Sequence, residues 1–502
     1  MANGRHHHVL ILGGGTAGCV LAARLSEDHR RTVCLVEAGP DYGPFVGGAW
    51  PADLVDPRSP SDSHDWYPRA EMSLSRARVI GGCSVHNAAF VVWGDRCDYD
   101  EWAAPGWGFD SIEPYLRRAE RTIGTRPLDR EEVGPWARAV LDAAPDAGIP
   151  RLQDLNDLSS PLGAAHIPVN VQGFARWNTA FAYLDAARGR ENLTVIGDAL
   201  VDRVLLQGRR ARGAVVRIDG ESIELGAELV ILSAGAFGSP GVLMRSGIGP
   251  ADHLADFGIA VEVDLPGVGK NLQDHSGINM VFRATAELER ELDRQGAGGS
   301  MFGSGTIVRA ASRACSAGTW DIHLVSWAAR DTEGITGGSW RVQLSPYVMK
   351  PASTGSVRLS SADPTEPLEL DLGFLSDPGR ADLAVIADGA ELVRKFAATD
   401  ALRRLLAGEA RPGADVATRE QLEAYVCANV RGYFHGVGTC RIGAAGDRGA
   451  VVDASGAVHG AERLCVCDAS IIPTVPRANT NLTTIAVAER ITELVVHQLQ
   501  PV

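Results

Sequence analysis

The sequence predicts an α/β fold with two parts: a Rossmann-like nucleotide-binding domain and a second, α+β domain built on an antiparallel sheet. Three observations predict this fold. A strand, a glycine-rich turn and a helix open the chain at residues 9–25. A near-continuous apolar run at 229–236 is typical of a strand in a parallel sheet. Apolar and polar residues partly alternate at 320–327 and 340–349, as they do in half-buried antiparallel strands.

The first strand and helix enclose the glycine spacing of a dinucleotide-binding turn. Four apolar residues precede Gly13, Gly15 and Gly18, which fit the pattern G-x-G-x-x-G. The first glycine permits the tight turn, the second lets the backbone approach a pyrophosphate, and the third lets the helix pack closely on the strand. Free N–H groups at the helix N-terminus would then donate hydrogen bonds to the phosphates.

A second apolar strand, at 32–36, ends at Glu37. This glutamate comes about 20 residues after the glycines, where an acidic side chain binds the ribose hydroxyls of adenosine. A glutamate rather than an arginine at this point disfavours a ribose 2′-phosphate. The glycine pattern alone is a weak signal, and the alternative is a glycine-rich turn that binds nothing. The strands, helix and glutamate around it favour a nucleotide site.

A long loop, 40–75, follows the second strand and is rich in Pro, Asp and Ser. It carries Trp50, Trp66 and Tyr67. A loop of this length in a compact domain is usually functional, so we expect it to cover the site. The run 76–89 then meets a double glycine and small residues, which suits a close approach of the backbone to a flat ligand.

The order of the remaining patterns predicts that the first domain is discontinuous. Helical patterns at 110–145 are followed by strand patterns at 190–275, and strands and helices of a different texture fill the stretch to 434. A strand at 464–468 and a helix at 485–499 then return to the first domain. We therefore expect the nucleotide-binding domain to comprise residues 1–148, 190–274 and 435–502, and the second, substrate-binding domain to comprise residues 149–189 and 275–434.

Composition narrows the class of protein. With 502 residues, 45% of them hydrophobic and 22% charged, the chain resembles an ordinary globular protein with room for two cores. It has no apolar run long enough to span a bilayer and no apolar signal segment, so we expect a cytoplasmic protein that does not bind membranes. The net charge of −14 disfavours nucleic acid as a partner and mildly favours a cationic substrate. The nine cysteines are expected to be reduced, and no metal site is predicted.

Five stretches, in a fixed order along the chain, look like the signatures of one family. They are residues 77–91, 235–249, 265–275, 435–443 and 479–483. Through them the chain resembles the glucose–methanol–choline flavin oxidoreductases, essentially from end to end. The resemblance implies that the nucleotide is FAD, held in the fold that Gly13 opens, and that the chain is an enzyme.

The resemblance also implies roles for individual positions. Val201 would contact adenine through its backbone, Asn87 and Ala88 would lie along the flavin, and Asp468 and Ala469 would face the pyrophosphate and ribityl chain. The full set of implied cofactor-binding residues is Gly13, Gly15, Thr16, Ala17, Gly18, Glu37, Ala38, Gly82, His86, Asn87, Ala88, Val201, Asp468, Ala469 and Asn481.

The chain departs from the family pattern at Cys83, His86 and Gly436. Family members with the sequence Gly-Gly-Cys-Ser-x-His-Asn, such as choline oxidases, carry FAD covalently bonded to that histidine. The resemblance therefore implies a bond between His86 and the flavin 8α-methyl group, since a neutral imidazole is nucleophilic. The alternative is a histidine that only packs over the dimethylbenzene edge of the flavin.

His435 and Asn479 are implied to be the catalytic pair. A histidine with an unperturbed pKa of about 6.5 accepts a proton near neutral pH, so His435 would be the base for an alcohol hydroxyl. Asn479 would hydrogen-bond the substrate oxygen and orient it toward flavin N5. A helix from Thr484 onward would direct its positive end toward charge near flavin N1. His275 is expected to make a structural contact with the backbone, and His323 to be packed or exposed, although it could line the pocket.

The implied reaction is oxidation of the CH–OH group of a primary or secondary alcohol to a carbonyl, by proton abstraction and hydride transfer to the flavin. The alternative is a non-redox, FAD-containing lyase of the same fold, similar to hydroxynitrile lyases. A sugar or amino-sugar hydroxyl is favoured over choline, because Asp274-His275 is not followed by the glutamate of choline enzymes and Phe434 replaces a tyrosine. Trp66, Trp320, Trp327 and Trp340 are candidates for the pocket wall. The electron acceptor is either oxygen or another molecule, and the protein is either a monomer or a homodimer; the sequence favours neither alternative in each case.

Overall fold

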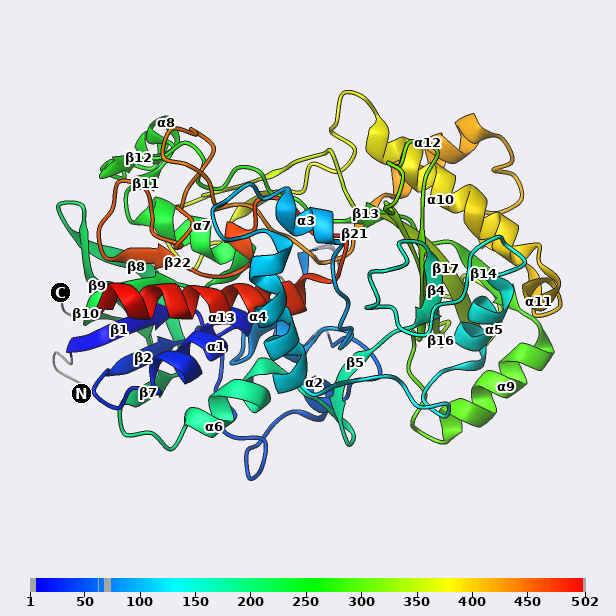
Figure 1. Cartoon of the computed structure of the whole chain (residues 1–502), viewed down its shortest axis with the longest axis horizontal. Helices are drawn as coiled ribbons and strands as arrows, with labels where there is room; N and C mark the ends of the chain where they lie inside the picture. The colour runs from blue at the N-terminus through cyan, green and yellow to red at the C-terminus, as the bar shows by residue number, and fades with distance from the viewer. Residues whose placement is uncertain (1–5, 62, 67–73, 500–502) are drawn as a thin grey trace.

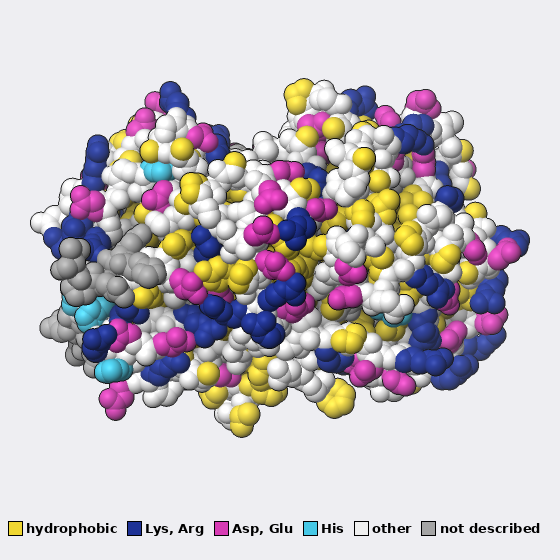
Figure 2. Space-filling model, viewed as in Figure 1, with side chains coloured by type: hydrophobic (Ala, Val, Ile, Leu, Met, Phe, Trp, Pro, Cys, Tyr) yellow, Lys and Arg dark blue, Asp and Glu magenta, His cyan; other side chains and the backbone are white. Residues whose placement is uncertain are grey.

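The computed structural model describes residues 6–61, 63–66 and 74–499. Two sheets lie at opposite ends of the long axis of the molecule, and both described ends of the chain lie beside the first sheet (Figure 1). The predicted fold class is confirmed, because the first sheet is mainly parallel and Rossmann-like and the second is antiparallel. On the face viewed, acidic and basic side chains are interspersed (Figure 2), so the negative net charge is not gathered in one patch there.

The first sheet has the strand order β7-β2-β1-β10-β9-β8, with β22 paired to β10. Its strands are β1 (His6–Leu12), β2 (Val33–Val36), β7 (Leu193–Ile196), β8 (Ala199–Gln207), β9 (Arg210–Ile218), β10 (Glu221–Leu232) and β22 (Leu464–Val466). The end of β10 pairs with β1 in parallel, while its beginning pairs with β9 antiparallel. The central strands are covered on both faces, which explains their continuous apolar runs.

Helices from both ends of the chain cover this sheet. They are α1 (Thr16–Leu25), α4 (Phe109–Thr122), α7 (Gly235–Arg245) and α13 (Thr480–Leu499), and α13 packs against α1 and α4. The last helix begins at Thr480, earlier than the predicted 484 or 485. The threonines of this turn interrupt the apolar periodicity from which a helix is predicted. In the structure the Thr484 hydroxyl donates a hydrogen bond to the Thr480 carbonyl at 2.8 Å, so this hydroxyl is satisfied inside the helix.

The second sheet is antiparallel, with the order β20-β14-β17-β16-β15-β4, and β13 joins β17 to β21. Its strands are β4 (Gly163–His166), β13 (Ser276–Gly277), β14 (Val281–Ala284), β15 (Thr306–Ala310), β16 (Ile322–Arg330), β17 (Trp340–Val348), β20 (Leu406–Arg411) and β21 (Arg431–Gly432). Helices α5 (Pro135–Ala143), α9 (Ala286–Ala297) and α10 (Ala381–Ala397) cover one face. A separate two-stranded sheet pairs β18 (Ser356–Arg358) with β19 (Glu369–Asp371).

Shorter elements complete the described part of the chain. They are α2 (Ala52–Val55), α3 (Arg96–Asp100), α6 (Asp185–Ala187), α8 (Ala251–Asp256), α11 (Asp400–Arg403), α12 (Arg419–Asn429), β3 (Thr125–Arg126), β5 (Val169–Gln172), β6 (Ala175–Arg176), β11 (Ile248–Gly249), β12 (Val263–Asp264), and the irregular helices η2 (Gly82–Val85), η3 (Ala180–Leu184) and η4 (Ala469–Ile471). All nine cysteines are free thiols, as expected.

Two segments pack differently from the predicted domain division. Trp136 and Val140 of α5 lie in the core of the second sheet, although residues up to 148 were assigned to the first domain. Phe181 and Leu184 of η3 lie in the core of the first sheet, although 149–189 was assigned to the second. An amphipathic pattern shows that a helix has a buried face, but it does not show which sheet that face covers. Elsewhere the division stays a prediction.

Candidate active site

The glycine-rich turn has the close contacts that its sequence predicts. Gly13 has a φ of +112°, and a Cβ there would lie 2.4 Å from the Ser233 carbonyl oxygen. A Cβ on Gly18 would lie 2.0 Å from the Gly13 carbonyl oxygen, so this glycine lets α1 pack directly on the turn. Both positions therefore require glycine, one for conformation and contact, the other for contact alone.

Segments far apart in the sequence meet at this turn. A Cβ on Gly82 would lie 2.6 Å from the Cα of Gly15, and the Gly81 N–H donates to the Gly14 carbonyl at 2.8 Å. The two glycine-rich backbone segments thus form a cradle, and a side chain at position 82 would occupy the space between them.

The C-terminal segment also reaches the turn. The Thr16 hydroxyl donates to Asn481 Oδ1 at 3.2 Å, so the N-terminal ends of α1 and α13 lie together. Ala17 follows Thr16 in the buried first turn of α1. Two helix N-termini beside a glycine cradle suit the phosphates of a dinucleotide.

Glu37 is buried at the end of β2 and shapes the same turn. Its Oε2 accepts from the Gly14 N–H at 2.8 Å, and its Oε1 accepts from the Gly39 N–H at 2.9 Å. Burial raises the pKa of this carboxyl to about 7, against the effect of these hydrogen bonds. Ala38 accepts from Arg78 through its carbonyl at 3.0 Å. The ribose-binding role of Glu37 and the role of Ala38 stay predictions.

Asp468 joins β22 to the first turn of α7. Its Oδ2 accepts from the Ser239 hydroxyl at 2.5 Å and from the Gly235 N–H at 2.8 Å. Ala469 follows at the start of η4 and is partly buried. Val201 lies buried in β8, with its carbonyl accepting from Arg245 at 3.4 Å. Their contacts with the pyrophosphate, ribityl chain and adenine stay predictions.

His86 ends the η2 turn and is 8% exposed. Its Nδ1 is buried with no hydrogen-bond partner among the described residues. Burial, and then Arg176 and Arg76, lower its pKa to about 4, so the imidazole is neutral at neutral pH. Asn87 Oδ1 accepts a hydrogen bond from the Ala89 N–H at 2.8 Å, and Ala88 packs against the hydrophobic core that contains Ala89. The unpaired nitrogen and the glycine cradle fit a bound flavin nucleotide.

His435 and Asn479, separated by 44 residues, are brought together. Asn479 Nδ2 lies 3.0 Å from His435 Nε2, and both side chains are buried. His435 follows Phe434, whose φ of +69° is an outlier for a bulky residue and stores strain at this point. Phe434 is 39% exposed.

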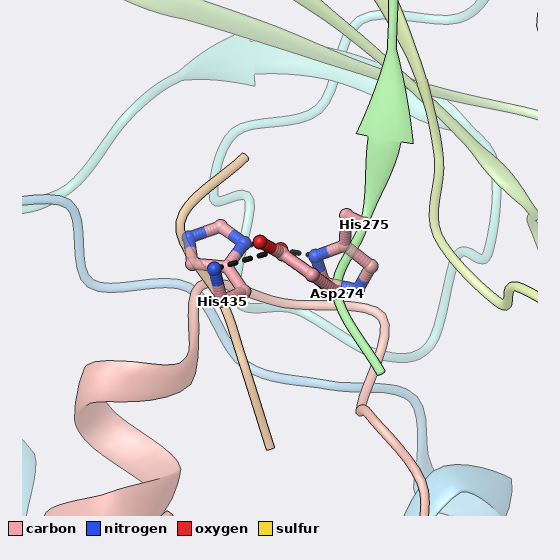
Figure 3. A group of neighbouring side chains, drawn as sticks. All are labelled: Asp274, His275 and His435. Carbon is pink, nitrogen blue, oxygen red and sulfur yellow. Dashed lines mark hydrogen bonds between the residues drawn. The ribbon is translucent and has the colours of Figure 1, made fainter. Parts of the chain in front are cut away.

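A chain of hydrogen bonds fixes the proton positions of His435. His275 Nε2 lies 3.0 Å from the Pro476 carbonyl, which can only accept, so His275 carries its proton there. Burial lowers the pKa of His275 to about 3, so its Nδ1 is a lone pair. This Nδ1 lies 2.8 Å from His435 Nδ1, which must therefore donate (Figure 3). The lone pair of His435 is left on Nε2, facing Asn479.

Sequence analysis did not predict this role for His275. The expected contact with the backbone is present, but the second ring nitrogen orients His435. Asp274 was also missed. Asp274 Oδ1 accepts a hydrogen bond from the backbone N–H of His435 at 2.8 Å, and burial raises the pKa of the Asp274 carboxyl to about 6. The stretch Asp274-His275 was noted only as part of a family segment, and its proximity to residue 435 comes from the pairing around β13 and β21.

Asp274, His275 and His435 offer three potential metal ligand atoms within 4.8 Å of one another. A hydrogen bond explains their geometry better than a metal. Two nitrogens bound to one tetrahedral zinc at 2.0–2.1 Å lie about 3.3 Å apart. The two Nδ1 atoms lie 2.8 Å apart, a hydrogen-bond distance.

The predicted tryptophans lie in different places. Trp320 is buried under Arg309, with the guanidinium carbon 4.5 Å from the ring centroid. Trp340 is not at the site, because it lies at the opposite end of β17 from Val348 and donates to Asp293 of α9. Trp66 is 38% exposed, and Tyr67 lies outside the described residues. The Tyr433 ring lies 4.4 Å from the His435 ring, between centroids, and Tyr347 stacks on Tyr433 at 4.2 Å.

Comparison with known proteins identifies the family. GMC oxidoreductase models match residues 7–277 and 351–488. The chain belongs to the GMC oxidoreductase family. It is 33% identical to the oxygen-dependent choline dehydrogenase of Vibrio vulnificus, over 98% of this chain and 95% of that protein. It is also 33% identical to the 5-(hydroxymethyl)furfural oxidase of Methylovorus sp., over 97% of this chain and 98% of that protein.

A solved structure of the same family has the same fold. Pyridoxine 4-oxidase from Mesorbium loti superposes with a TM-score of 0.86 and 28% identity, over 98% of this chain and 99% of that one. This GMC oxidoreductase is therefore a flavoprotein that oxidises a CH–OH group to a carbonyl. These similar proteins give no support for the lyase alternative. Among the described residues, no helix combines the length and apolar character needed to cross a bilayer.

Proposed function

We propose that this GMC oxidoreductase oxidises a small-molecule alcohol with His435 Nε2 as the base. The observation that carries the proposal is the hydrogen-bond chain from the Pro476 carbonyl through His275 to His435. It leaves a single lone pair on the catalytic imidazole and aims it at Asn479, 3.0 Å away. FAD, when bound, accepts the hydride from the carbon that carries the hydroxyl.

In the proposed reaction the substrate hydroxyl replaces Asn479 as the donor to His435 Nε2. Asn479 then donates its N–H to the substrate oxygen and fixes the oxygen's position. Its Oδ1 has no hydrogen-bond partner among the described residues, and the Tyr433 side chain lies beside the amide. When Nε2 takes the proton, the imidazolium keeps its Nδ1–H on His275, and the buried carboxyl of Asp274 lies beside the new charge.

The reaction class is tested by adding alcohols to the oxygen-free holoenzyme and recording the visible absorption of the flavin. Oxidation of the alcohol bleaches the flavin, whereas a lyase would release a carbonyl product with the flavin still oxidised. Choline, 5-(hydroxymethyl)furfural and pyridoxine are the alcohols in the names of the similar proteins, and simple sugars and amino sugars extend the series. Carbonyl release without bleaching would contradict the proposal.

We further propose that His86 is bonded covalently to the FAD. The residues Gly-Gly-Cys-Ser-Val-His-Asn at 81–87, a neutral imidazole, and an unpaired buried Nδ1 support this. Acid precipitation of the holoenzyme should leave the yellow colour in the pellet. The variant His86→Ala should release it to the supernatant. Colour wholly in the supernatant of the wild type would show that no such bond exists.

We propose that oxygen or another small molecule accepts the electrons. We also propose that the enzyme is cytoplasmic and is a monomer or a homodimer. A screen of alcohols in parallel with oxygen and with an artificial dye tests the first choice. Faster turnover with the dye than with oxygen would indicate a dehydrogenase, and the reverse an oxidase.

A further inference from the structure

Three side chains form a row across neighbouring strands of the antiparallel sheet. Arg309 of β15 pairs with His323 of β16, and His323 pairs with Tyr347 of β17. Residues directly opposite on antiparallel strands point to the same face, with Cβ atoms about 4.5–5.5 Å apart. Tyr347 stacks on Tyr433 at 4.2 Å, and Tyr433 lies 4.4 Å from His435. The row therefore leads from Arg309 toward the catalytic base.

This row lies on the face of the sheet that is turned toward the implied flavin segment. Ile307 and Val325, each two residues along its strand and on the same face, pack in one core with Tyr347, Ala89 and Ala478. Ala89 follows the residues implied to lie along the flavin, and Ala478 precedes Asn479. The other face of the sheet packs against α5 and α10.

Arg309 and His323 of this row are buried, and several of their polar atoms have no hydrogen-bond partner among the described residues. His323 is fully buried, and neither ring nitrogen has a hydrogen-bond partner among the described residues. Arg309 is fully buried too. Its Nη2 donates to the carbonyls of Asp157 and Ser160, at 3.2 and 2.8 Å, but Nε and Nη1 have no described partner. Trp320 Nε1, beneath the guanidinium, is also unpaired.

These unpaired atoms are mostly donors. Burial lowers the pKa of Arg309 to about 10, so the guanidinium stays charged at neutral pH. Burial also lowers the pKa of His323 well below 6.5, so this ring is neutral and offers one donor and one acceptor. The hydrogen bonds from Arg309 to described residues end on two backbone carbonyls, not on a carboxylate. The carboxylates of Asp95, Asp157 and Asp154 act on this charge without a hydrogen bond, so the unpaired Nε and Nη1 still require an acceptor, either a bound oxygen anion or waters.

We propose that Arg309 and His323 bind a carboxylate of the substrate, at the end of the molecule remote from the hydroxyl that is oxidised. The inference rests on the proposed function of the site and names the substrate class. Guanidinium binds carboxylate through two parallel N–H groups, and His323 adds a third donor. The same charge opposes an ammonium group at this position, so the site disfavours the amine that the net charge of −14 favours.

The spacing sets the size of the substrate. Arg309 and Tyr347 lie on strands separated by β16, so their backbones are about 10 Å apart. Because the arginine side chain reaches part of this distance, a single ring between hydroxyl and carboxylate fits. We therefore choose 4-(hydroxymethyl)benzoate as the probe and 4-(hydroxymethyl)benzamide as its neutral counterpart.

The experiment compares flavin reduction by these two alcohols in the oxygen-free holoenzyme. We expect the wild type to have at least a tenfold higher kcat/KM for the benzoate. Arg309→Met should remove that preference by tenfold or more, since charge-assisted hydrogen bonds are lost. Arg309→Lys should keep part of it, and His323→Asn should weaken it. Arg126→Met, which removes a partly buried arginine from its ion pair with Glu132, is the matched control and should leave the preference unchanged.

A second readout does not depend on turnover. The non-oxidisable 4-methylbenzoate should perturb the flavin absorption of the wild type at concentrations at least tenfold lower than for Arg309→Met. Equal kcat/KM for the two alcohols in the wild type, or an intact preference in a folded Arg309→Met or His323→Asn, would show that buried waters satisfy these atoms and overturn the inference.

The two proposals fail differently. If neither these two alcohols nor those of the series under the proposed function reduce the flavin, but 4-methylbenzoate binds in an Arg309-dependent way, the carboxylate site stands and the proposed function is wrong. If the benzamide reduces the flavin at least as well as the benzoate, the function stands and the carboxylate site is wrong.

Discussion

At the scale of single residues, the site depends on a histidine held by another histidine. A carboxylate that accepted a hydrogen bond from His435 Nδ1 would raise the pKa of His435, whereas a neutral imidazole in the same place raises it far less. His275 is fully buried, with its pKa lowered to about 3, so it stays a neutral acceptor over a wide pH range. The arrangement keeps the base unprotonated and leaves its orientation fixed.

Replacing the base tests its assignment directly. His435→Ala should slow flavin reduction by about 10²- to 10⁴-fold, because proton removal then depends on water. FAD should stay bound, since no cofactor contact is assigned to this side chain. Stopped-flow absorbance under anaerobic conditions measures the rate. His166→Ala, which removes a partly buried histidine bonded to Thr306, is the control. Retention of more than a tenth of the wild-type rate in His435→Ala would refute the assignment.

The pH profile is the second prediction at this scale. Burial, and then His275 and Arg76, lower the pKa of His435 well below 6.5. A base acts in its neutral form, and a lowered pKa extends that form to lower pH. We therefore expect kcat/KM for flavin reduction to stay level as the pH falls from 8 to 6.5, with the acid limb below 6.5. An acid limb with its midpoint at or above pH 6.5 would contradict the tautomer chain.

At the scale of elements, the cofactor turn is built from two backbone segments in contact. Gly15 opens α1 and Gly82 opens η2. A Cβ on Gly82 would lie 2.6 Å from the Gly15 Cα, whereas a Cβ on Gly15 would make an ordinary contact of 3.8 Å with the Gly82 Cα. The segment that begins at Gly82 is thus positioned by a backbone contact and not by side-chain packing alone.

A methyl group should break this contact. Gly82 has a φ of +51°, and its Cβ would lie 2.6 Å from Gly15 Cα. Gly208→Ala is a matched control, because Gly208 has a φ of +58° but open space around its Cβ. Both substitutions cost about 1 kcal/mol for the left-handed backbone. Only Gly82→Ala should also lose FAD, measured by absorbance after gel filtration. Equal FAD content in the two variants would contradict the contact.

At the scale of the whole molecule, a buried carboxylate connects the two halves. Asp98 of α3 is fully buried and accepts from the Arg477 N–H at 2.7 Å and from the Arg477 guanidinium. Lys350, at the end of the second sheet, lies 3.3 Å from the same carboxylate. Arg477 is two residues before Asn479, so this cluster links the antiparallel sheet to the segment that carries Asn479.

Removing that carboxylate should destabilise the protein as a unit. Asp98→Ala leaves the Arg477 guanidinium largely buried without its counter-ion, which costs about 3–5 kcal/mol. Asp110→Ala removes the partner of Arg96 in an ion pair whose aspartate side chain is 88% exposed, and should cost less than about 1 kcal/mol. Urea unfolding followed by tryptophan fluorescence measures both. A loss of similar size in the two variants would mean that Asp98 does not carry this linkage.

The parts of the protein that depend on neighbours along the chain could be predicted from the order of the residues alone. Strand periodicity and the glycine spacing predicted β1, α1 and the turn between them, since these reflect local geometry. The family segments pointed to His435 and Asn479, which the fold brings within 3.0 Å. Only the tertiary structure decided that His275 orients His435 and that Arg309, His323 and Tyr347 share one face of a sheet. Those relations depend on strand register and on contacts between residues as far as 160 positions apart, which no local pattern encodes.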